Sequence, residues 1–430
     1  MGIAVEATCS PRVTIKMVYS GVQSRSFGEA SAHLENLCEL SISDERIRRA
    51  THHAAEERIA QQDRLISAYR NKTLPEQRSQ KPADVEAPDI ACVMCDGGRY
   101  QLLDRQSSQT DTADEEPNDT ERRGKHWHES RVSLLASMKG EHHEVDPQPE
   151  LPNCLEFYAI GTTLSEIAKV GAKPGAKETP EQRTEREKRE QARKELQESL
   201  VGPELVSSNV VASGQNWEAF GPMVATRAWY SGFAAAKHKV FVSDGSSTIE
   251  KLQETYFSNF TSVLDLLHGL GYSMHVARAT TSVESDTAKS YNHWAALIWQ
   301  GKVGAVIKEF DALQKLHGDP PPDCKADDVR EVIRAARVYY TNHQHRMNYP
   351  EYRRKGYPLT SSLMESTVKQ INYRVKGTEK YWSTEGGEKI LRLRGDYLSG
   401  DQPMQAFWKS LRYEATGFRS YRSDSVGIAG

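Results

Sequence analysis

Three carboxylates in this sequence have the residue types and spacing that phosphodiester chemistry needs. Asp96 and Asp244 each follow a short apolar run and precede a glycine, in VMCDGG and VFVSDGS, whereas Glu365 begins a later helical pattern. We expect both aspartates at strand ends, where glycine lets the chain turn away from a ligand. Two Mg²⁺ or Mn²⁺ ions, about 3.5–4 Å apart, would neutralise the attacking and leaving oxygens. In this hypothesis Asp96 bridges both ions, and Asp244 and Glu365 each complete one site.

The helix that carries Glu365 also carries cations. Its apolar residues recur at helical spacing and predict one buried stripe, formed by Met364, Val368, Ile371 and Val375. Glu365, Lys369, Asn372 and Lys376 form a polar stripe beside it. An ordinary surface helix explains the same pattern, because an acid suits the first turn and pairs well with a lysine four residues on. The choice depends on partner carboxylates elsewhere in the chain.

The charge is nearly balanced overall but not along the chain. The formal net charge is −3, yet residues 331–424 contain 17 Lys and Arg against 10 Asp and Glu. This excess indicates either a surface for phosphates or a solvated helical face. The cations that we place against DNA are Arg46, Arg48, Arg49, Arg353, Arg354, Lys355, Lys369, Arg374 and Lys376.

The remaining patterns predict the order of the elements. Residues 26–61 read as two helices, the second capped by Ser43, and they suit a helix-turn-helix reader of DNA. DIACVMCDGGRYQLL reads as a strand, a Gly-Gly turn and the start of a second strand, and HWHESRVSLLASMKG as a third. An acidic loop over 106–125 and a charged helix over 177–200 are also expected. WEAFGPMVATRAWY predicts a helix, KHKVFVSDG a fourth strand, and about 274–340 a helical region.

The expected elements follow the chain order of the ribonuclease-H-like fold. In that order an early strand carries the first Asp, a later strand the second Asp, and a helix after them the Glu. We therefore expect an α/β protein with a mixed sheet, interrupted by a helical insertion between the second Asp and the Glu. The predicted boundaries are an N-terminal helical module at 1–85, the first part of the core at 86–260, the insertion at 261–345, and the second part of the core at 346–425.

Several segments resemble the ISKra-type insertion-sequence transposases, bacterial relatives of the Mutator-like DDE enzymes. The most specific part is the pattern RM-x-Y…YR-x-x-G-x-P…ES…R-x-KG…W from Arg346 to Trp382. The resemblance implies that Asp96, Asp244 and Glu365 are the DDE triad, and that Asp265 and His268 form the (C/D)-x-x-H element. Asp265 competes with Asp244 as the second acid, and His268 is as readily a core residue as one near DNA. The sequence departs from the family at residues 360–362, where Thr-Ser-Ser replaces a Gly-Ser-Gly-like turn.

The resemblance implies a transposase that cuts and joins double-stranded DNA at terminal inverted repeats and inserts it into target DNA. Paired ends imply a homodimer or a larger assembly. Two alternatives stay open: a nuclease of the same fold without strand transfer, and an inactive DNA-binding remnant. No long apolar run indicates a membrane span. Six cysteines in 430 residues favour a reducing cytoplasm. Because the expected substrate is DNA, we expect the protein to associate with the nucleoid there.

Overall fold

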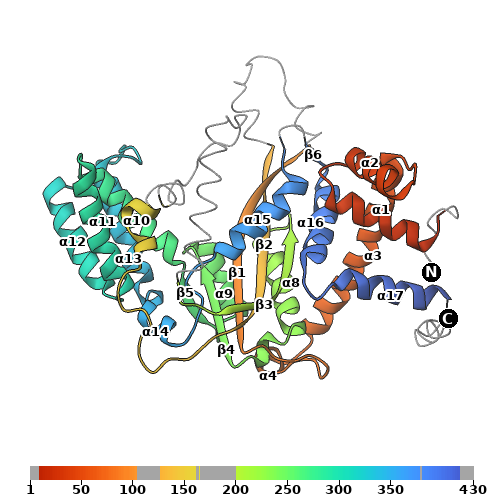
Figure 1. Cartoon of the computed structure of the whole chain (residues 1–430), viewed down its shortest axis with the longest axis horizontal. Helices are drawn as coiled ribbons and strands as arrows, with labels where there is room; N and C mark the ends of the chain where they lie inside the picture. The colour runs from red at the N-terminus through yellow and green to blue at the C-terminus, as the bar shows by residue number, and fades with distance from the viewer. Residues whose placement is uncertain (1–8, 104–125, 161–163, 165–199, 378–379, 417–430) are drawn as a thin grey trace, which may run out of the picture.

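The computed structural model describes residues 9–103, 126–160, 164, 200–377 and 380–416, with backbone alone for 412–416. The predicted acidic loop at 106–125 and all but the last residue of the predicted charged helix at 177–200 lie outside the described residues. Figure 1 shows a sheet at the centre of the molecule, with helical groups on both of its sides.

A mixed sheet organises the described part of the chain. Its strands are β1 (Ile90–Leu102), β2 (Trp127–Lys139), β3 (Glu204–Ser213), β4 (His238–Ser243), β5 (Thr261–Leu264) and β6 (Tyr381–Trp382). The order is β3-β2-β1-β4-β5, and β6 pairs with β1. β1, β2 and β3 pair antiparallel, whereas β4 and β6 run parallel to β1, and β5 runs parallel to β4. The predicted α/β class with a mixed sheet is confirmed.

The predicted Gly-Gly turn after Asp96 is wrong, because β1 runs through Gly97 and Gly98 without a break and has 13 residues in all. Asp96 therefore lies inside the strand, opposite Val132 of β2, rather than at its end. A Cβ atom on Gly98 would lie 2.6 Å from Ser130 Oγ and 3.0 Å from Asn372 Oδ1. The glycine thus allows a helix to cross close above the strand instead of reversing the chain.

Strand β3 was not predicted. Its first half, Glu204–Ser207, is exposed, and its second half is buried or half-buried. A strand that is half exposed and rich in serine has a weak hydrophobic pattern, and its place is set by pairing with β2.

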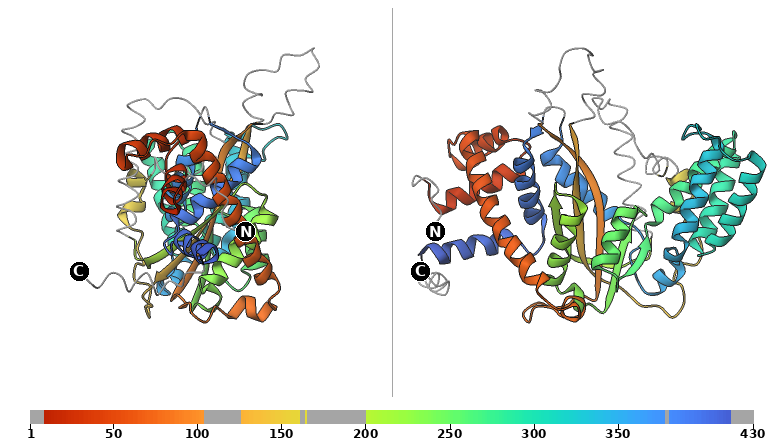
Figure 2. Two further views of the ribbon diagram at one scale, coloured as in Figure 1. Left: turned by 90° about the vertical axis from the view of Figure 1, so that its right-hand side faces the viewer. Right: turned by 180° about the vertical axis from the view of Figure 1, so that it is seen from behind.

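Helices cover both faces of the sheet (Figure 2). On one face, α8 (Trp217–Tyr230) and α9 (Ser247–Tyr256) share a hydrophobic cluster with Val93 and Phe241. On the other face, α15 (Ser362–Val375) crosses β1 and β2, and α16 (Thr384–Leu398) covers β3. The second cluster includes Met94, Val132 and Ile371. Successive residues of β1 thus serve opposite layers, which fixes the register of the strand.

The helical region between Asp244 and Glu365 forms a bundle at one side of the sheet (Figure 1). It contains α10 (Leu266–Thr280), α11 (Glu284–Trp299), α12 (Val303–His317) and α13 (Val329–His343), and the short α14 (Tyr349–Arg354) follows. The region predicted as an insertion begins with β5, however, and β5 pairs with β4 in the sheet. Within 261–345, residues 261–264 therefore belong to the sheet.

The N-terminal helices are α1 (Pro11–Gln23), α2 (Phe27–Cys38), α3 (Asp44–Arg70) and α4 (Leu74–Ser79). Ser43 caps α3 as predicted, but α3 has 27 residues and continues past Gln61. Met17 and Ile47 share a hydrophobic cluster with Leu393 of α16 and Phe407 of α17 (Pro403–Thr416). The first and last helices of the described chain therefore form one packed unit.

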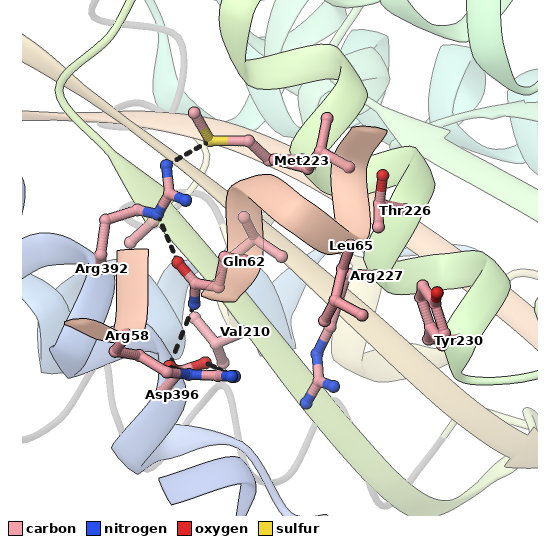
Figure 3. A pocket seen from close by; sticks show the side chains of 13 residues that line it. Arg58, Gln62, Leu65, Val210, Met223, Thr226, Arg227, Tyr230, Arg392 and Asp396 are labelled. Carbon is pink, nitrogen blue, oxygen red and sulfur yellow. Dashed lines mark hydrogen bonds and ion pairs between the residues drawn. The ribbon is translucent and has the colours of Figure 1, made fainter. Parts of the chain in front are cut away.

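A buried polar network joins this unit to the sheet (Figure 3). Arg58 Nε donates to Asp396 Oδ2 at 2.7 Å, and Gln62 Nε2 donates to the same oxygen at 3.0 Å. Arg392 Nε donates to Gln62 Oε1 at 2.8 Å. These residues line a cavity of about 70 Å³ between α3, α8, β3 and α16, with the Thr226 side chain on its far side. The network fixes α3 against α16 and against the sheet.

Candidate active site

Asp96 is the centre of the candidate site. Its side chain is half-buried on β1, and its Oδ1 accepts a hydrogen bond from the Gly97 amide at 2.6 Å. Burial, together with the negative charges of Asp244 and Glu365, raises the pKa of Asp96 to about 6, against that hydrogen bond and the charge of His268. The three acids of the sequence hypothesis therefore act on one another electrostatically.

Asp244 follows β4 and is placed by a tight turn. Gly245 has a φ of +93°, and the Asp244 Oδ1 accepts a hydrogen bond from the Ser246 amide at 2.9 Å. The Tyr339 hydroxyl donates to the Asp244 carbonyl at 2.7 Å, so α13 of the helical bundle fixes this turn. The Asp-Gly signal thus marks a turn at Asp244 but not at Asp96. Asp96 on β1 and Asp244 after β4 each lie two residues beyond the last pair of these parallel strands, Met94 and Val242.

Glu365 lies in the first turn of α15 and is half-buried. The buried stripe predicted for this helix is confirmed: Met364, Ile371 and Val375 are buried, and Val368 packs against the same cluster. The charge of Glu365 raises the pKa of both Asp96 and His268. The helix therefore brings its acid close enough to act electrostatically on Asp96 and His268.

Asp265 is a structural carboxylate beside this group. It is 1% exposed and caps α10, with Oδ1 accepting from the His268 amide at 2.8 Å and lying 3.1 Å from His268 Nδ1. Its Oδ2 accepts from the Ser361 hydroxyl at 2.7 Å and from the Ser361 amide. Because both oxygens are engaged, Asp265 holds the start of α15 against α10. The geometry favours Asp244 as the second acid.

His268 places a positive charge next to the acids. Burial lowers its pKa, but the hydrogen bond and charge of Asp265, together with the charges of Asp244 and Glu365, outweigh burial and raise the pKa to about 9. The imidazole is therefore protonated at neutral pH. Its side chain is 29% exposed, so it is not a fully enclosed core residue.

The Thr-Ser-Ser turn before Glu365 needs no glycine. Ser361 has φ −98° and ψ 23°, and neither Thr360 nor Ser362 has a positive φ. The Ser361 hydroxyl and amide bind Asp265, which is a role that glycine could fill only with its amide. The departure from the Gly-Ser-Gly-like turn is thus compatible with this backbone.

The donor set fits a hard divalent cation. Asp96, Asp244 and Glu365 offer carboxylate oxygens, and burial together with the two other acids raises the pKa of Asp96, so a bound cation would favour its ionised form. Within the described residues, no three His, Cys, Asp or Glu side chains are already close enough to hold a metal ion. The side chains of the triad would have to close around an ion on binding.

Two of the predicted cations share the exposed side of α15 with Glu365. Lys369 and Lys376 are exposed, and Lys376 Nζ lies 5.9 Å from the centre of the Trp127 ring. This placement agrees with the row of cations expected from the sequence, whereas contact with DNA stays a prediction.

Arg353 is wrongly placed by the sequence hypothesis. Its side chain is fully buried, stacks over the Trp299 ring at 3.9 Å and donates from Nε to Asp146 at 2.8 Å. A guanidinium enclosed by these partners cannot reach a phosphate on the surface. It holds α14 against α11 and the loop that contains Asp146.

Arg354 and Lys355 are also far from the acids, and both pair with Glu351, at 2.8 and 3.1 Å. The next residue, Gly356, lies against Gly140, whose amide donates to Asp89 just before β1. Asp96 is seven residues beyond Asp89 along β1, which is roughly 20 Å at the usual rise per residue of a strand. Nearness in sequence to Glu365 therefore does not place these cations beside it.

Arg374 lies on the buried side of α15, away from Lys369 and Lys376, and is 1% exposed. Its Nε donates to the Gly21 carbonyl at 2.9 Å and its Nη1 to the Arg25 carbonyl at 3.1 Å. Arg374 therefore does not belong to the exposed row of Lys369 and Lys376, and its side chain ties α15 to the N-terminal helices.

The three N-terminal arginines lie at the start of α3. Arg48 and Arg49 are exposed and pair with Glu45, at 2.7 and 3.7 Å, while Arg46 donates to Cys9 Sγ at 3.1 Å. Their contact with terminal repeats stays a prediction.

Sequence reasoning also missed residues. Arg25 and Lys380 line one pocket together with the guanidinium of Arg374. Each is a single cation between unrelated patterns, so spacing gave no signal, and the grouping arises only from the packing of α15 on α2 and α3.

In the described part of the chain, no helix is both long and apolar enough to cross a bilayer. No protein-family model and no curated protein sequence matches the chain. The resemblance to ISKra-type transposases thus rests on the motifs of the sequence.

Proposed function

We propose that this protein is a DDE transposase of the ISKra type, which cuts and joins double-stranded DNA at terminal inverted repeats and inserts it into target DNA. The observation that carries the proposal is the position of Asp96. Its pKa is raised by burial and by the charges of Asp244 and Glu365, just beyond the paired part of the parallel strands β1 and β4. A buried carboxyl group with a raised pKa, acted on by two further acids, is typical of a catalytic site.

The sheet supports the ribonuclease-H-like assignment. Three antiparallel strands followed by two strands parallel to the first, in the order β3-β2-β1-β4-β5, are compatible with that core. The helical bundle enters between the second Asp and the Glu, where the resemblance implies an insertion.

The residues have distinct proposed roles. Asp96, Asp244 and Glu365 would hold two Mg²⁺ or Mn²⁺ ions, which when bound neutralise the attacking and leaving oxygens of the phosphodiester. Protonated His268 offsets part of the negative charge while Asp265 orients it. Lys369 and Lys376 lie where they can contact the DNA backbone beyond Glu365.

Paired ends are required to join two element termini to one target. We therefore propose a homodimer or larger assembly, acting in the cytoplasm on DNA of the nucleoid. The helix start that bears Arg46, Arg48 and Arg49 would read the terminal repeats.

The test is a strand-transfer assay with the inverted repeats that flank the gene as pre-cut duplexes, a plasmid target and Mg²⁺. The proposal expects joined products from the parent protein and none from Asp96→Asn or Asp244→Asn. Cleavage without joining would assign the protein to the nucleases of this fold. Binding to the repeats with neither reaction would identify an inactive remnant.

A further inference from the structure

A basic pocket lies where the N-terminal helices meet the end of α15. Its volume is about 330 Å³. It is formed by the segment before α2, the first part of α3, the end of α15, β6 and the start of α16. Its polar lining includes Arg25, Arg48, His52, Arg374, Lys380 and Tyr381.

The lining of this basic pocket is unusual in its charge. Arg25, Arg48, Arg374 and Lys380 contribute four cations, and no described lining residue is an acid. Arg25 and Arg48 are exposed and Lys380 is half-buried, so a ligand from solvent can reach them. Three acids beside the lining already have partners. Glu45 binds Arg48 at 2.7 Å, Glu29 accepts from the Arg25 amide, and Glu385 binds Lys389 at 2.5 Å.

Arg374 provides an unused donor to the same pocket. Its guanidinium lies 4.7 Å from the Phe27 ring centre and 4.8 Å from that of Trp382, while Nε and Nη1 donate to backbone carbonyls. Its Nη2 is buried without a hydrogen-bond partner. An unsatisfied buried donor of a charged group is costly, and an anion accepting from it would remove that cost.

Two helix N-termini face the pocket as well. Ser26 caps α2 and Ser383 caps α16, and both residues line it. The partial positive charge of a helix N-terminus favours bound anions. The dipoles and the four cations therefore act in the same direction.

The ionisable groups record this positive field. Burial and the charges of Arg374 and Arg25 lower the pKa of Lys380, against a smaller effect of Glu29. Burial, Lys389 and Arg48 lower the pKa of His52 to about 4, with Glu56 and Glu385 opposing them. A negative ligand would relieve the repulsion among these groups.

We propose that this pocket binds a backbone phosphate of the DNA, with Arg374 at its floor and Arg25, Arg48 and Lys380 around its mouth. The inference rests on the proposed function and adds a DNA contact that links the N-terminal helices to the catalytic core. Nine residues of α15 separate Glu365 from Arg374, about 14 Å along the helix. At about 3.4 Å per base step, this distance corresponds to about four steps of duplex.

The test uses the full chain and a short duplex of arbitrary sequence, with affinity measured over a series of salt concentrations. The double variant Arg25→Gln, Lys380→Gln should bind about tenfold more weakly, because it removes charge-assisted hydrogen bonds to the phosphate. The slope of log K against log salt should become shallower by about 0.9 for each phosphate that the variant no longer neutralises. Lys237→Gln is the matched control, since this exposed lysine lies beside Asp89 and should change neither quantity.

Other outcomes separate this inference from the proposed function. If the double variant melts like the parent and keeps the parent's affinity and salt slope, the pocket does not contact DNA. If inorganic phosphate stabilises the parent but not the double variant, while DNA affinity is equal in both, the pocket takes free phosphate and the DNA assignment is wrong. If the double variant binds DNA more weakly and with a shallower salt slope, but the parent neither cleaves nor joins DNA, the pocket is supported and the transposase proposal is contradicted.

Discussion

Asp96 is surrounded by charges that make its ionisation unfavourable in the absence of a metal. Its pKa of about 6 lies above the ordinary value of 3.8, because burial and two neighbouring acids disfavour the carboxylate. The folded state therefore keeps a proton between about pH 4 and pH 6 that the unfolded state has lost. Stability from this group is present at low pH and is lost as the pH rises through 6.

Asp96→Asn should consequently stabilise the metal-free protein at pH 7 and leave it nearly unchanged at pH 4. A shift of about two pKa units corresponds to about 3 kcal/mol. Urea unfolding at both pH values in the presence of a chelator measures the difference. Mg²⁺ should raise the stability of the parent and not of the variant, since only the parent keeps the full ligand set. If Asp96→Asn changes the free energy of unfolding equally at pH 4 and pH 7, the pKa of Asp96 is not raised in the folded state.

Glu365→Gln should retain the helix and remove the charge that a metal needs. We expect cleavage and joining to fall by at least about 10²–10³-fold, the usual loss when one electrostatic contact to the reacting group is removed. Binding to terminal-repeat DNA should persist or tighten, because a negative charge near phosphate is gone. The matched control is Glu284→Gln, another glutamate in the first turn of a helix, which should keep the parent's rate. Parental activity in Glu365→Gln would contradict the proposed role.

At the scale of elements, the position of α15 depends on its first residues. Asp265 caps α10 and binds Ser361, so it sets how the Glu365 helix meets the sheet. The apolar stripe of α15 was predictable because four residues at helical spacing can be read from the sequence. The contact between Ser361 and Asp265 was not, because it joins residues 96 positions apart.

Asp265→Ala should therefore act through position. It removes the acceptor for Ser361 and His268 and leaves buried donors unpaired, which costs about 1–3 kcal/mol. It also removes the main partner that keeps His268 protonated, so the pKa of His268 should fall. NMR titration of the histidine measures that shift, and the Asp265→Asn variant should restore part of the stability but not the pKa. An unchanged titration would show that the pair does not form.

The packing of helices also limits what the number of charged residues in a segment can predict about its surface. The basic excess of residues 331–424 suggested a surface for phosphates, yet several of its cations are buried: Arg346, Arg353, Arg374, Lys389, Arg392 and Arg394. Arg353 stacks on Trp299 and Arg374 on Trp382, contacts that depend on tertiary packing. Local sequence records the number of cations but not which side of a helix is covered. The strand that carries Asp96 was predictable from its apolar run, whereas its continuation through Gly97 and Gly98 follows from pairing with β2.

At the scale of the whole molecule, the N-terminal helices are joined to the core by buried ion pairs. Arg58 and Asp396 are both less than 10% exposed, and Gln62 completes their hydrogen bonds (Figure 3). The sequence predicted an N-terminal helical module but gave no sign of its attachment, because Arg58 and Asp396 lie 338 residues apart.

Arg58→Met should destabilise the whole fold, because it leaves Asp396 buried without its cation. A broken buried pair typically costs about 3–5 kcal/mol. Arg48→Gln, at the exposed pair with Glu45, should change the free energy of unfolding by less than about 1 kcal/mol. Urea unfolding followed by circular dichroism compares the two. Removing both charges with Arg58→Met, Asp396→Leu should recover part of the loss, and failure to recover any would indicate damage beyond the ion pair.

The shared cluster of the first and last helices has a consequence for synthesis on the ribosome. Met17 and Val18 are synthesised long before Leu393, Met404 and Phe407, which belong to the same hydrophobic cluster. With about 390 residues between them and a synthesis rate of about 5–20 residues per second, the N-terminal helices wait roughly 20–80 s for their partners. During that interval their apolar faces are open to chaperones. The helix start that bears Arg46, Arg48 and Arg49 reaches its packed position only after Leu393 and Phe407 have been synthesised.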